Sequence, residues 1–455
     1  MPADAHRPLL VHGYVDAHEL ASKLVETDGD LLLSGGTLID GTGSPPAADS
    51  AVLVRDGRIL RAGPRAAFTR AAPKTARVID TAGRWIIPGL IDCHVHFTGD
   101  HVERKVVGGS VVFEEAPTQR RFMEPIHSAR LFRAAANAMV LLAAGFTTVR
   151  NLGHGDAAHV STLKDAVRQG LILAPDIVDS RWAISQTGGH GKVMIWPYDL
   201  AHSERARASF ADGVKECVRH VERNISEGAD CIKIYTSEGM INAPDRLEGL
   251  ANYSQREVNA MVAAAHRRGR KLSAHAVTAE GTRRAVVGGV DTIEHGPHEL
   301  DESVLKLMSK QRTFLVPTLE SYDFASKGRQ DHVFGRWVGE RAGRRLVTRM
   351  EVVRRAYELG VPLALGTGAG PPPRGGRNAR ELELLVDAGL PPLEVLRIAT
   401  SASAEAVGRD HVVGAIKPGR RADMLVLRAD PVADIGTLRD RRTIERIVHP
   451  RRLDG

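Results

Sequence analysis

The sequence of 455 residues predicts an α/β fold, a TIM (β/α)8 barrel with a small β-sandwich domain that both ends of the chain build. Three observations predict this fold. In the middle of the chain, short apolar segments alternate with amphipathic helical segments about eight times, which is typical of a parallel barrel. Short runs of Val, Ile and Leu near both ends indicate short strands. Histidines and a lysine stand in or directly after several of the central apolar segments.

The small β domain is expected from two separate stretches of sequence. Near the start, strands are expected at 30–38, 51–55, 58–62 and 77–79, with Asp56 and Gly57 as a hairpin turn. Similar sequence returns at 422–427 and 444–448. The predicted domains are therefore an N-terminal extension (1–29), a composite small β domain (30–86 with 410–455) and a catalytic barrel (87–409).

The barrel strands are expected to end where apolar runs stop, near His96, Asn151, Gln186, Thr236, Ala276, Glu294, Glu320 and Thr367. Helices are expected between them at 127–143, 157–169, 207–227, 254–268, 279–288, 301–311 and 336–358. The fourth helix begins with a capping box, because Ser254 precedes Glu257 by one helical turn. Long segments at 97–126, 321–335 and 371–376 follow strands one, seven and eight, and we expect them to cover a pocket.

The composition argues against several classes of function. Hydrophobic residues make up 43% and charged residues 26%, and no apolar run approaches the roughly 20 residues of a membrane helix. The net charge of +7 comes from arginine pairs interleaved with acids, and aromatic residues are 4%, so no nucleic-acid partner is expected. The start lacks the apolar core of a signal peptide, and three cysteines make no disulfide framework, which favours the cytoplasm.

A pair of histidines, His94 and His96, follows the apolar run at 85–91. Side chains alternate across a strand, so both imidazoles face one side and can converge on one cation. The pair stands at the carboxyl end of the first predicted barrel strand, where α/β folds bind ligands. Ordinary strand ends also carry such pairs, so the interpretation depends on finding further ligands.

Further candidate ligands follow other predicted strands. His275 and His295 stand at the ends of strands five and six, and Lys233 lies inside strand four. In a barrel, the ends of the strands face each other across the mouth. A buried ammonium group is costly and needs a partner or a chemical role. Four histidines and a barrel lysine together predict a metal centre.

The order Gly89-Leu-Ile-Asp-Cys-His94-Val-His96, Lys233, His275 and His295 resembles the amidohydrolase superfamily. The resemblance spans most of residues 30–430 and includes Leu38-Ile-Asp-Gly-Thr-Gly, Glu381-Leu-Glu-Leu-Leu and Pro418-Gly-Arg-Arg-Ala-Asp-Met-Leu-Val-Leu. The segment Ile184-Ser-Gln-Thr-Gly-Gly-His190-Gly is similar to the imidazolonepropionase-like and prolidase-like branch, which includes dipeptidases and N-acyl amino acid hydrolases.

The resemblance implies a role for each matched residue. His94 and His96 would bind one Zn²⁺, His275 and His295 a second, and carboxylated Lys233 would bridge the two. A metal-activated water would then hydrolyse a C–N bond of a small amide, cyclic amide, N-acyl amino acid or dipeptide-like substrate. The resemblance also implies a homo-oligomer.

Other residues near the predicted mouth are assigned less directly. His190, Tyr235 and His298 are candidate substrate contacts, and Glu238 joins Lys233, His275 and His295 as a candidate catalytic residue. For His190 and Tyr235, an ordinary loop histidine and a packed tyrosine are the alternative interpretation.

One position departs from the pattern of the superfamily. Strand eight normally ends in Gly-Thr-Asp, where the Asp binds a metal and moves the hydrolytic proton, but this sequence reads Leu365-Gly-Thr-Gly368. No Asp or Glu occurs between Gly360 and Arg380, and Gly375 stands where related sequences commonly carry a histidine. Loss of a general acid or base typically costs about 10²- to 10⁴-fold in rate.

Three explanations stay open at this point. The first is a hydrolase in which Glu238, His190 or His298 moves the proton instead. The second is a metal-dependent reaction without hydrolysis, catalysed by a lyase, isomerase, cyclase or decarboxylase. The third is an inactive member, natural or engineered, that holds a metal or a ligand.

Overall fold

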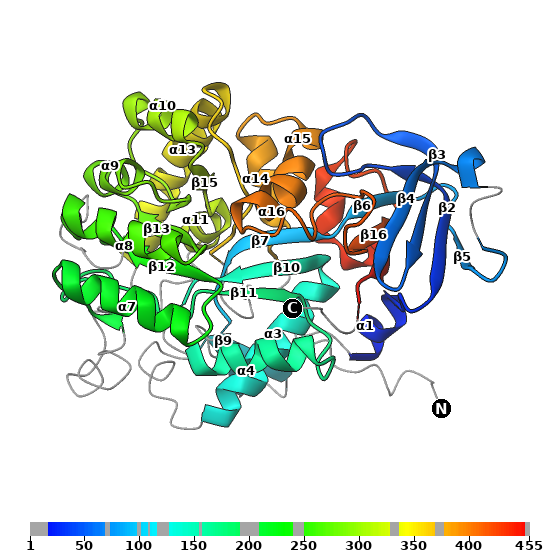
Figure 1. Ribbon diagram of the computed structural model, residues 1–455, viewed down its shortest axis with the longest axis horizontal. Helices are drawn as coiled ribbons and strands as arrows, with labels where there is room; N and C mark the ends of the chain where they lie inside the picture. Colours follow the sequence, from blue (N-terminus) through cyan, green and yellow to red (C-terminus); the bar gives the residue numbers. More distant parts are fainter. Residues whose placement is uncertain are drawn as a thin grey trace.

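The computed structural model describes residues 17–68, 73–97, 102–107, 110–115, 127–153, 157–191, 209–239, 250–327, 336–368 and 377–450. Figure 1 shows two regions. In the first region, blue strands from the start of the chain lie beside a red strand from its end. The second region contains helices from the middle of the chain, in green and yellow.

The first region is one sheet of eight described strands, which we call the terminal sheet. Its strands are β1 (Leu24–Val25), β2 (Asp30–Leu38), β3 (Ala47–Arg55), β4 (Arg58–Pro64), β5 (Arg77–Asp80), β6 (Trp85–Pro88), β16 (Met424–Leu427) and β17 (Ile444–Val448). Their order is β1-β17-β16-β6-β2-β3-β4, and β5 pairs with β2. Both ends of the chain contribute strands to one sheet, as predicted.

The hairpin between β3 and β4 turns at Asp56 and Gly57, whose φ angles are 46° and 75°. Positive φ at both central residues is the conformation of a type I′ hairpin turn. β3 begins at Ala47, earlier than expected, because it stays paired with β2 as far as Leu38. The two-layer sandwich and the limits of the domains stay predictions.

Seven described strands of the second region run parallel in two groups. The groups are β7 (Leu90–Val95), β10 (Phe146–Asn151) and β11 (Asp176–Asp179), and β12 (Cys231–Tyr235), β13 (Lys271–Ala276), β14 (Thr292–His295) and β15 (Phe314–Val316). A parallel bridge between Ile184 and Ile234 connects the chain after β11 with β12. Parallel strands separated by helices make this a TIM-barrel-like α/β fold.

The segment 361–368 takes the place of the expected eighth strand. Leu363 forms a parallel bridge with Leu315 of β15. On the other side, Cys93 N donates to Leu365 O and Gly368 N donates to His94 O, both at 2.8 Å. The segment therefore bonds to β15 on one side and to β7 on the other.

The helices occur largely where the sequence predicts them. The α-helices are α1 (Ala17–Lys23), α3 (His127–Ala143), α4 (Ala157–Arg168), α7 (Val214–Ser226), α8 (Gln255–Arg267), α9 (Ala279–Val287), α10 (Glu302–Gln311), α11 (Leu319–Ser326), α13 (Arg336–Glu358), α14 (Arg380–Asp387), α15 (Pro392–Arg397) and α16 (Ser403–Ala406). Short helices of other types are η1 (Arg65–Phe68), η2 (Ile398–Ala402), η3 (Ile435–Arg439) and η4 (Arg441–Thr443). The capping box of Ser254 and Glu257 at α8 is confirmed. Of the described helices, none is long and apolar enough to cross a membrane.

Three predicted element ends are wrong. Strand three was expected to end near Gln186, but β11 ends at Asp179, and a positive φ of 57° at Arg181 interrupts it. The helix expected from 207 begins at Val214 within the described residues, because Gly213 before it has a φ of 76°.

Strand seven is the third wrong end. It was expected to reach Glu320, but β15 ends at Val316 and helix α11 begins at Leu319. The Glu381 carboxyl group accepts hydrogen bonds from Leu319 N at 2.9 Å and Glu320 N at 2.6 Å. This capping from a distant helix starts α11 where the local sequence predicts the end of a strand.

The segments expected to cover a pocket are described only in part. Within 97–126, strands β8 (Val102–Val107) and β9 (Ser110–Glu115) pair with each other. Within 321–335, residues up to 326 belong to α11. Residues 98–101, 108–109, 116–126, 328–335 and 369–376 lie outside the described residues.

A buried ion cluster joins the terminal sheet to the central strands. Arg421 donates to Asp176, the first residue of β11, at 3.1 Å and to Asp423 at 2.7 Å. His449 donates from Nδ1 to Asp423 at 2.9 Å. A buried cation between two carboxylates becomes costly when one partner is removed.

We expect Arg421→Met to lower the free energy of unfolding by about 3–5 kcal/mol, because it leaves two buried carboxylates without their cation. Urea denaturation followed by circular dichroism measures the change. The control is Arg442→Met, which removes an exposed ion pair with Asp440 and should leave the denaturation midpoint unchanged. Equal midpoints for the two variants would contradict the expectation.

Candidate metal centre

His94 and His96 face the same side at the end of β7, as their spacing predicts. Their ring centroids lie 5.1 Å apart. His94 donates from Nδ1 to the Glu294 carboxylate at 2.7 Å, and His96 donates from Nδ1 to Gly153 O at 2.9 Å. Because Nδ1 carries the proton in each ring, the Nε2 lone pair of each is available for a metal.

His275 and His295 end neighbouring strands and bring two more rings to the same place. The His275 and His295 centroids are 4.5 Å apart, and the His295 centroid is 4.9 Å from that of His94. His295 follows Glu294 directly, so simple alternation would point the two side chains to opposite faces. A φ of 71° at His295 breaks the alternation, and both residues contact His94.

Lys233 lies on β12 and is 1% exposed. Within the described residues, its Nζ atom has no hydrogen-bond partner, and neither has His275 Nε2. Burial lowers the pKa of Lys233 to about 7, although the Glu294 carboxylate opposes this shift. A large fraction of the amine is therefore neutral near pH 7.

Three of the four histidines, His94, His275 and His295, are also held neutral. Burial, reinforced by the charge of Lys233, lowers the pKa of His94 to about 4. Burial and the charge of neighbouring histidines hold the pKa values of His275 and His295 well below their usual range. Neutral imidazoles keep the lone pairs that a metal requires.

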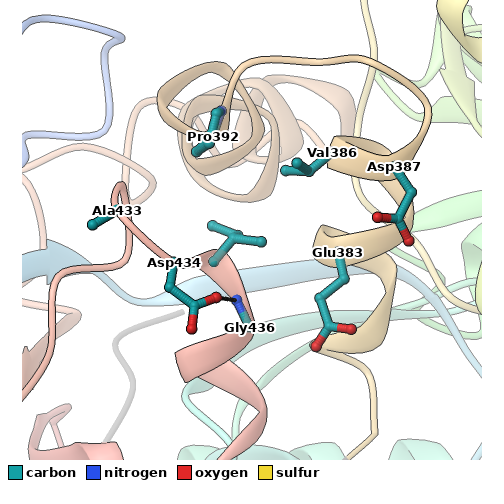
Figure 2. Close-up of a pocket in the computed structure, with 8 residues that line it drawn as sticks. Glu383, Val386, Asp387, Pro392, Ala433, Asp434 and Gly436 are labelled. Carbon is teal, nitrogen blue, oxygen red and sulfur yellow. Dashed lines mark hydrogen bonds between the residues drawn. The ribbon is translucent and has the colours of Figure 1, made fainter.

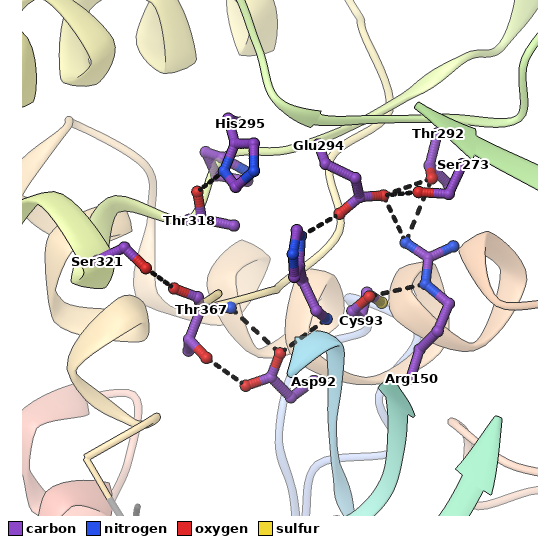
Figure 3. Close-up of polar contacts among 12 residues, drawn as sticks. Asp92, Cys93, Arg150, Ser273, Thr292, Glu294, His295, Thr318, Ser321 and Thr367 are labelled. Carbon is purple, nitrogen blue, oxygen red and sulfur yellow. Dashed lines mark hydrogen bonds and ion pairs between the residues drawn. The ribbon is translucent and has the colours of Figure 1, made fainter. Parts of the chain in front are cut away.

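Glu294 forms hydrogen bonds with several of the side chains around this centre. Its carboxylate accepts hydrogen bonds from His94, Arg150, Ser273 and Thr292 at 2.6–2.7 Å (Figure 3). Burial by itself would raise the pKa of Glu294, but the buried Arg150 guanidinium and the His94 N–H group keep it well below its usual range. Sequence reasoning missed Glu294 and Arg150. A carboxylate directly before His295 and an arginine inside an apolar strand were the available signals.

The residues present fit a metal pair. Within the described ranges, no three His, Cys, Asp or Glu side chains form a ready-made metal site. In the predicted centre, two histidines and a lysine carbamate would hold each metal. The Lys233 amine and the His275 Nε2 atom have no hydrogen-bond partner among the described residues and suit that donor set.

Gly368 stands at the rim of this centre. The Asp92 carboxylate accepts from Thr367 N at 3.1 Å and from Thr367 Oγ1 at 2.8 Å, which fixes the register of this segment against β7 (Figure 3). Gly368 has a φ of 60°, and a Cβ added to it would lie 2.8 Å from Ser321 Oγ. The position of the expected acid is therefore packed against a hydroxyl group. Gly375 lies outside the described residues.

His190 joins the histidine group from the loop after β11. Its ring stacks on His275 with centroids 4.2 Å apart and lies 4.8 Å from the Tyr235 ring. Burial raises the pKa of Tyr235, so its phenol stays protonated and is a hydrogen-bond donor. A Cβ added to Gly239 would lie 2.2 Å from His190 Cε1, so the absence of a side chain there makes room for the ring.

Comparisons with known proteins identify the family. Residues 85–448 match the model of the amidohydrolase family. The chain belongs to the amidohydrolase family. This confirms the predicted superfamily.

Among the relatives of this amidohydrolase, ochratoxinase of Aspergillus niger is 28% identical over 435 residues, covering 91% of this chain and 85% of that protein. The imidazolonepropionase of Methylobacterium nodulans is 28% identical over 404 residues, covering 85% and 89%. A crystal structure of a Xaa-Pro dipeptidase with methionine in its active site has a TM-score of 0.76 and 28% identity, covering 90% and 97%. These relatives support the predicted class, a hydrolase of C–N bonds.

Two candidate residues of the amidohydrolase have their main contacts elsewhere. The Glu238 carboxylate accepts from Leu250 N at 2.9 Å, which closes its own loop. His298 accepts from Arg349 Nη1 at 3.3 Å, and its ring centroid lies 6.2 Å from that of Tyr322. Of the three proposed replacements for the missing acid, His190 is the one whose ring contacts a candidate metal ligand.

A pocket of about 430 Å³ lies apart from the histidine group, between α14 and η3 (Figure 2). Glu383, Asp387 and Asp434 contribute carboxylates to its lining. Glu383 is paired with Arg380 and Arg439, and Asp434 accepts from Gly436 N. Two of the three carboxylates that line the pocket, those of Glu383 and Asp434, thus already have partners within the protein. The lining includes no candidate site residue.

We expect Gly239→Ala to displace the His190 ring and to lower the free energy of unfolding by about 1–3 kcal/mol, the usual cost of overpacking. In the background of His190→Ala, the same substitution should cost much less, because the ring is gone. A double-mutant cycle by urea denaturation measures this coupling.

The control for this cycle is Gly188→Ala, in the loop that carries His190. A Cβ at Gly188 meets nothing within 4 Å, so its effect should not depend on His190. Additive effects of Gly239→Ala and His190→Ala would show that the ring does not lie against Gly239.

Proposed function

We propose that this amidohydrolase hydrolyses a C–N bond in a small amide, cyclic amide, N-acyl amino acid or dipeptide-like molecule. A pair of divalent metals, foremost Zn²⁺, would be held by His94, His96, His275, His295 and carboxylated Lys233. The observation that carries the proposal is the buried Lys233 amine, which has no hydrogen-bond partner among the described residues and lies beside neutral histidines. In this proposal, segment 361–368 closes an eight-stranded barrel between β15 and β7, in keeping with its hydrogen bonds to both.

Carboxylation of Lys233 would remove the free-energy cost of burying its ammonium group. An amine reacts with CO₂ only in its neutral form, and burial lowers the pKa of Lys233 to about 7. The nitrogen of the neutral amine attacks CO₂, one C=O π bond gives way as the C–N bond forms, and one proton leaves the nitrogen for solvent, so that a neutral amine becomes an anionic carbamate. The Glu294 carboxylate, which contacts His94, already pairs with Arg150. A carbamate would therefore add the negative charge that two divalent cations require.

The chain's own residues supply orientation and proton movement. When bound, the metal pair would polarise the scissile carbonyl group and lower the pKa of a water. Glu294 and Gly153 O fix the ring orientation of His94 and His96. The Tyr235 phenol would donate a hydrogen bond to a substrate oxygen. With no carboxyl group at Gly368, we assign proton transfer to the leaving nitrogen to His190, which contacts His275.

The relatives support this class of substrate without fixing the substrate. The Xaa-Pro dipeptidase and the imidazolonepropionase are each aligned over most of this chain. A cytoplasmic location and a homo-oligomeric state stay predictions from the sequence.

Replacement of the lysine tests the metal centre. We expect Lys233→Met, when free of metal, to melt at a higher temperature than the metal-free wild type, because a buried amine without a partner is removed. Zinc with bicarbonate should raise the melting temperature of the wild type and much less that of the variant. Differential scanning calorimetry with and without zinc measures both effects. An equal rise in the two proteins would rule out a bridging carbamate.

Restoration of the missing acid tests hydrolysis. We expect Gly368→Asp alone to gain little turnover, because its Cβ would press on Ser321 Oγ, whereas Gly368→Asp with Ser321→Ala should gain at least about 10-fold. Turnover of N-acyl amino acids and dipeptides by the zinc-loaded enzymes is the measurement, with Ser321→Ala alone as the control.

The isotope content of the product separates the remaining alternatives. Hydrolysis in H₂¹⁸O places ¹⁸O in the carboxylate that is released. A wild type that transforms a substrate without incorporating ¹⁸O would overturn the proposed hydrolysis in favour of a non-hydrolytic reaction. A wild type that binds zinc, while neither it nor the double variant turns over any compound of the panel, would favour an inactive member.

A further inference from the structure

Arg349 is a buried arginine that the proposed reaction does not use. It lies in the middle of α13 and is 2% exposed. Its Nη1 atom donates to Gly296 O and its Nη2 atom donates to Pro317 O, both at 3.1 Å. One side chain therefore bonds to the backbone directly after β14 and directly after β15.

Both carbonyl groups belong to turns that place the metal centre. His295 has a φ of 71°, and Thr318 has a φ of 53°. These left-handed conformations are unfavourable for residues with a side chain and persist only where surrounding contacts hold them. The two turns also contact each other, since His295 Nδ1 and Thr318 Oγ1 are hydrogen-bonded at 2.6 Å.

The charge of Arg349 has no carboxylate in direct contact within the described residues. Its guanidinium carbon lies 4.4 Å from the centre of the Tyr322 ring, and its Nε atom has no hydrogen-bond partner there. Burial lowers its pKa, and Tyr322 and Glu381 oppose that shift. Backbone carbonyls are thus the principal acceptors of a costly buried cation, which points to a role in holding those carbonyls.

The guanidinium also determines the state of His298. All of its N–H groups are donors, so the Nδ1 atom of His298, 3.3 Å from Nη1, must accept. His298 is therefore neutral, with its proton on Nε2. In this state it can donate a hydrogen bond from Nε2, but it cannot take up a proton at Nδ1 while Arg349 is in place.

We propose that Arg349 is a positioning residue of the metal centre, which holds the turns after β14 and β15 so that His295 faces the other histidines. Arg349 would position the metal through His295 and its hydrogen-bond partner Thr318. The inference rests on the proposed function, because it requires that His295 bind a metal. It adds a residue from an outer helix, about 50 positions away in the chain, to the support of one metal site.

The test compares Arg349→Met with Arg421→Met, another buried arginine, located where β11 meets the terminal sheet. Both substitutions remove a buried guanidinium and should lower the melting temperature. We expect Arg349→Met to weaken binding of one of the two zinc ions by about 10- to 100-fold, the usual effect of losing a residue that orients a metal ligand. Arg421→Met should leave both zinc affinities unchanged.

Competition with a chromophoric chelator measures the zinc affinities of the full-length proteins, and the visible spectrum of the cobalt-loaded forms reports the geometry of each site. If Arg349→Met destabilises the protein but keeps both zinc affinities and the cobalt spectrum of the wild type, the proposal is overturned, because Arg349 is then only structural. If Arg349→Met does not fold, Arg349→Lys replaces it. Lysine keeps the charge but cannot reach both carbonyls, so a partial loss is expected and unchanged affinity counts against the proposal.

The same measurement separates the two proposals. A wild type that binds no zinc would sink the proposed metal centre and, with it, the role of Arg349. A wild type that binds two zinc ions, beside an Arg349→Met variant that binds them equally well, would leave the metal centre standing and remove only Arg349.

Discussion

The shortage of negative charge around the four histidines at the strand ends is the constraint on which the candidate site depends. Burial keeps the imidazoles of His94, His275 and His295 neutral, but a pair of divalent cations also requires anionic ligands. The Glu294 carboxylate, which contacts His94, is already engaged by Arg150. In the proposed function, Lys233 resolves the shortage by becoming a carbamate, since its amine has no hydrogen-bond partner among the described residues. The lysine, which alone would destabilise the core, would then give the arrangement its chemistry.

The geometry of the site depends on turns that break the regular alternation of the strands. Glu294 orients His94 from below, and the next residue, His295, reaches the same space because its backbone turns into a left-handed conformation. Two neighbouring residues of β14 thus serve one centre: Glu294 orients a candidate metal ligand, and His295 is itself a candidate ligand. Such turns need support from elsewhere in the fold, and the Arg349 side chain donates to one backbone carbonyl in each of two such turns, Gly296 O and Pro317 O. The strands bring the ligands together, and an outer helix holds the strand ends.

Local sequence patterns predicted the features that depend on neighbouring residues alone. The shared face of His94 and His96 follows from strand alternation, and the start of α8 follows from Ser254 and Glu257. Lys233, His275 and His295 stood out because each lies in an apolar run. What the sequence could not give are contacts between distant segments. Glu381 starts α11 in place of a longer strand seven, and Arg150 and Arg349 act on residues of other strands. Arg150 contacts the Glu294 carboxylate and a backbone carbonyl, and Arg349 contacts two backbone carbonyls. Such contacts between distant segments leave no pattern in the local sequence.

The absence of an acid at position 368 is matched by the packing of the residues around it. Gly368 has a left-handed backbone, and the hydroxyl group of Ser321 stands close to where a side chain would begin and donates to Thr367 O at 2.7 Å. Helix α11 and Gly368 are thus fitted to each other without a carboxyl group. In the proposed function, the group that moves the proton would then approach from elsewhere on the rim. Gly239, in the loop after β12, leaves room for the His190 ring against His275. Space is closed at Gly368 and open at Gly239, which is the arrangement that proton transfer by His190 would require.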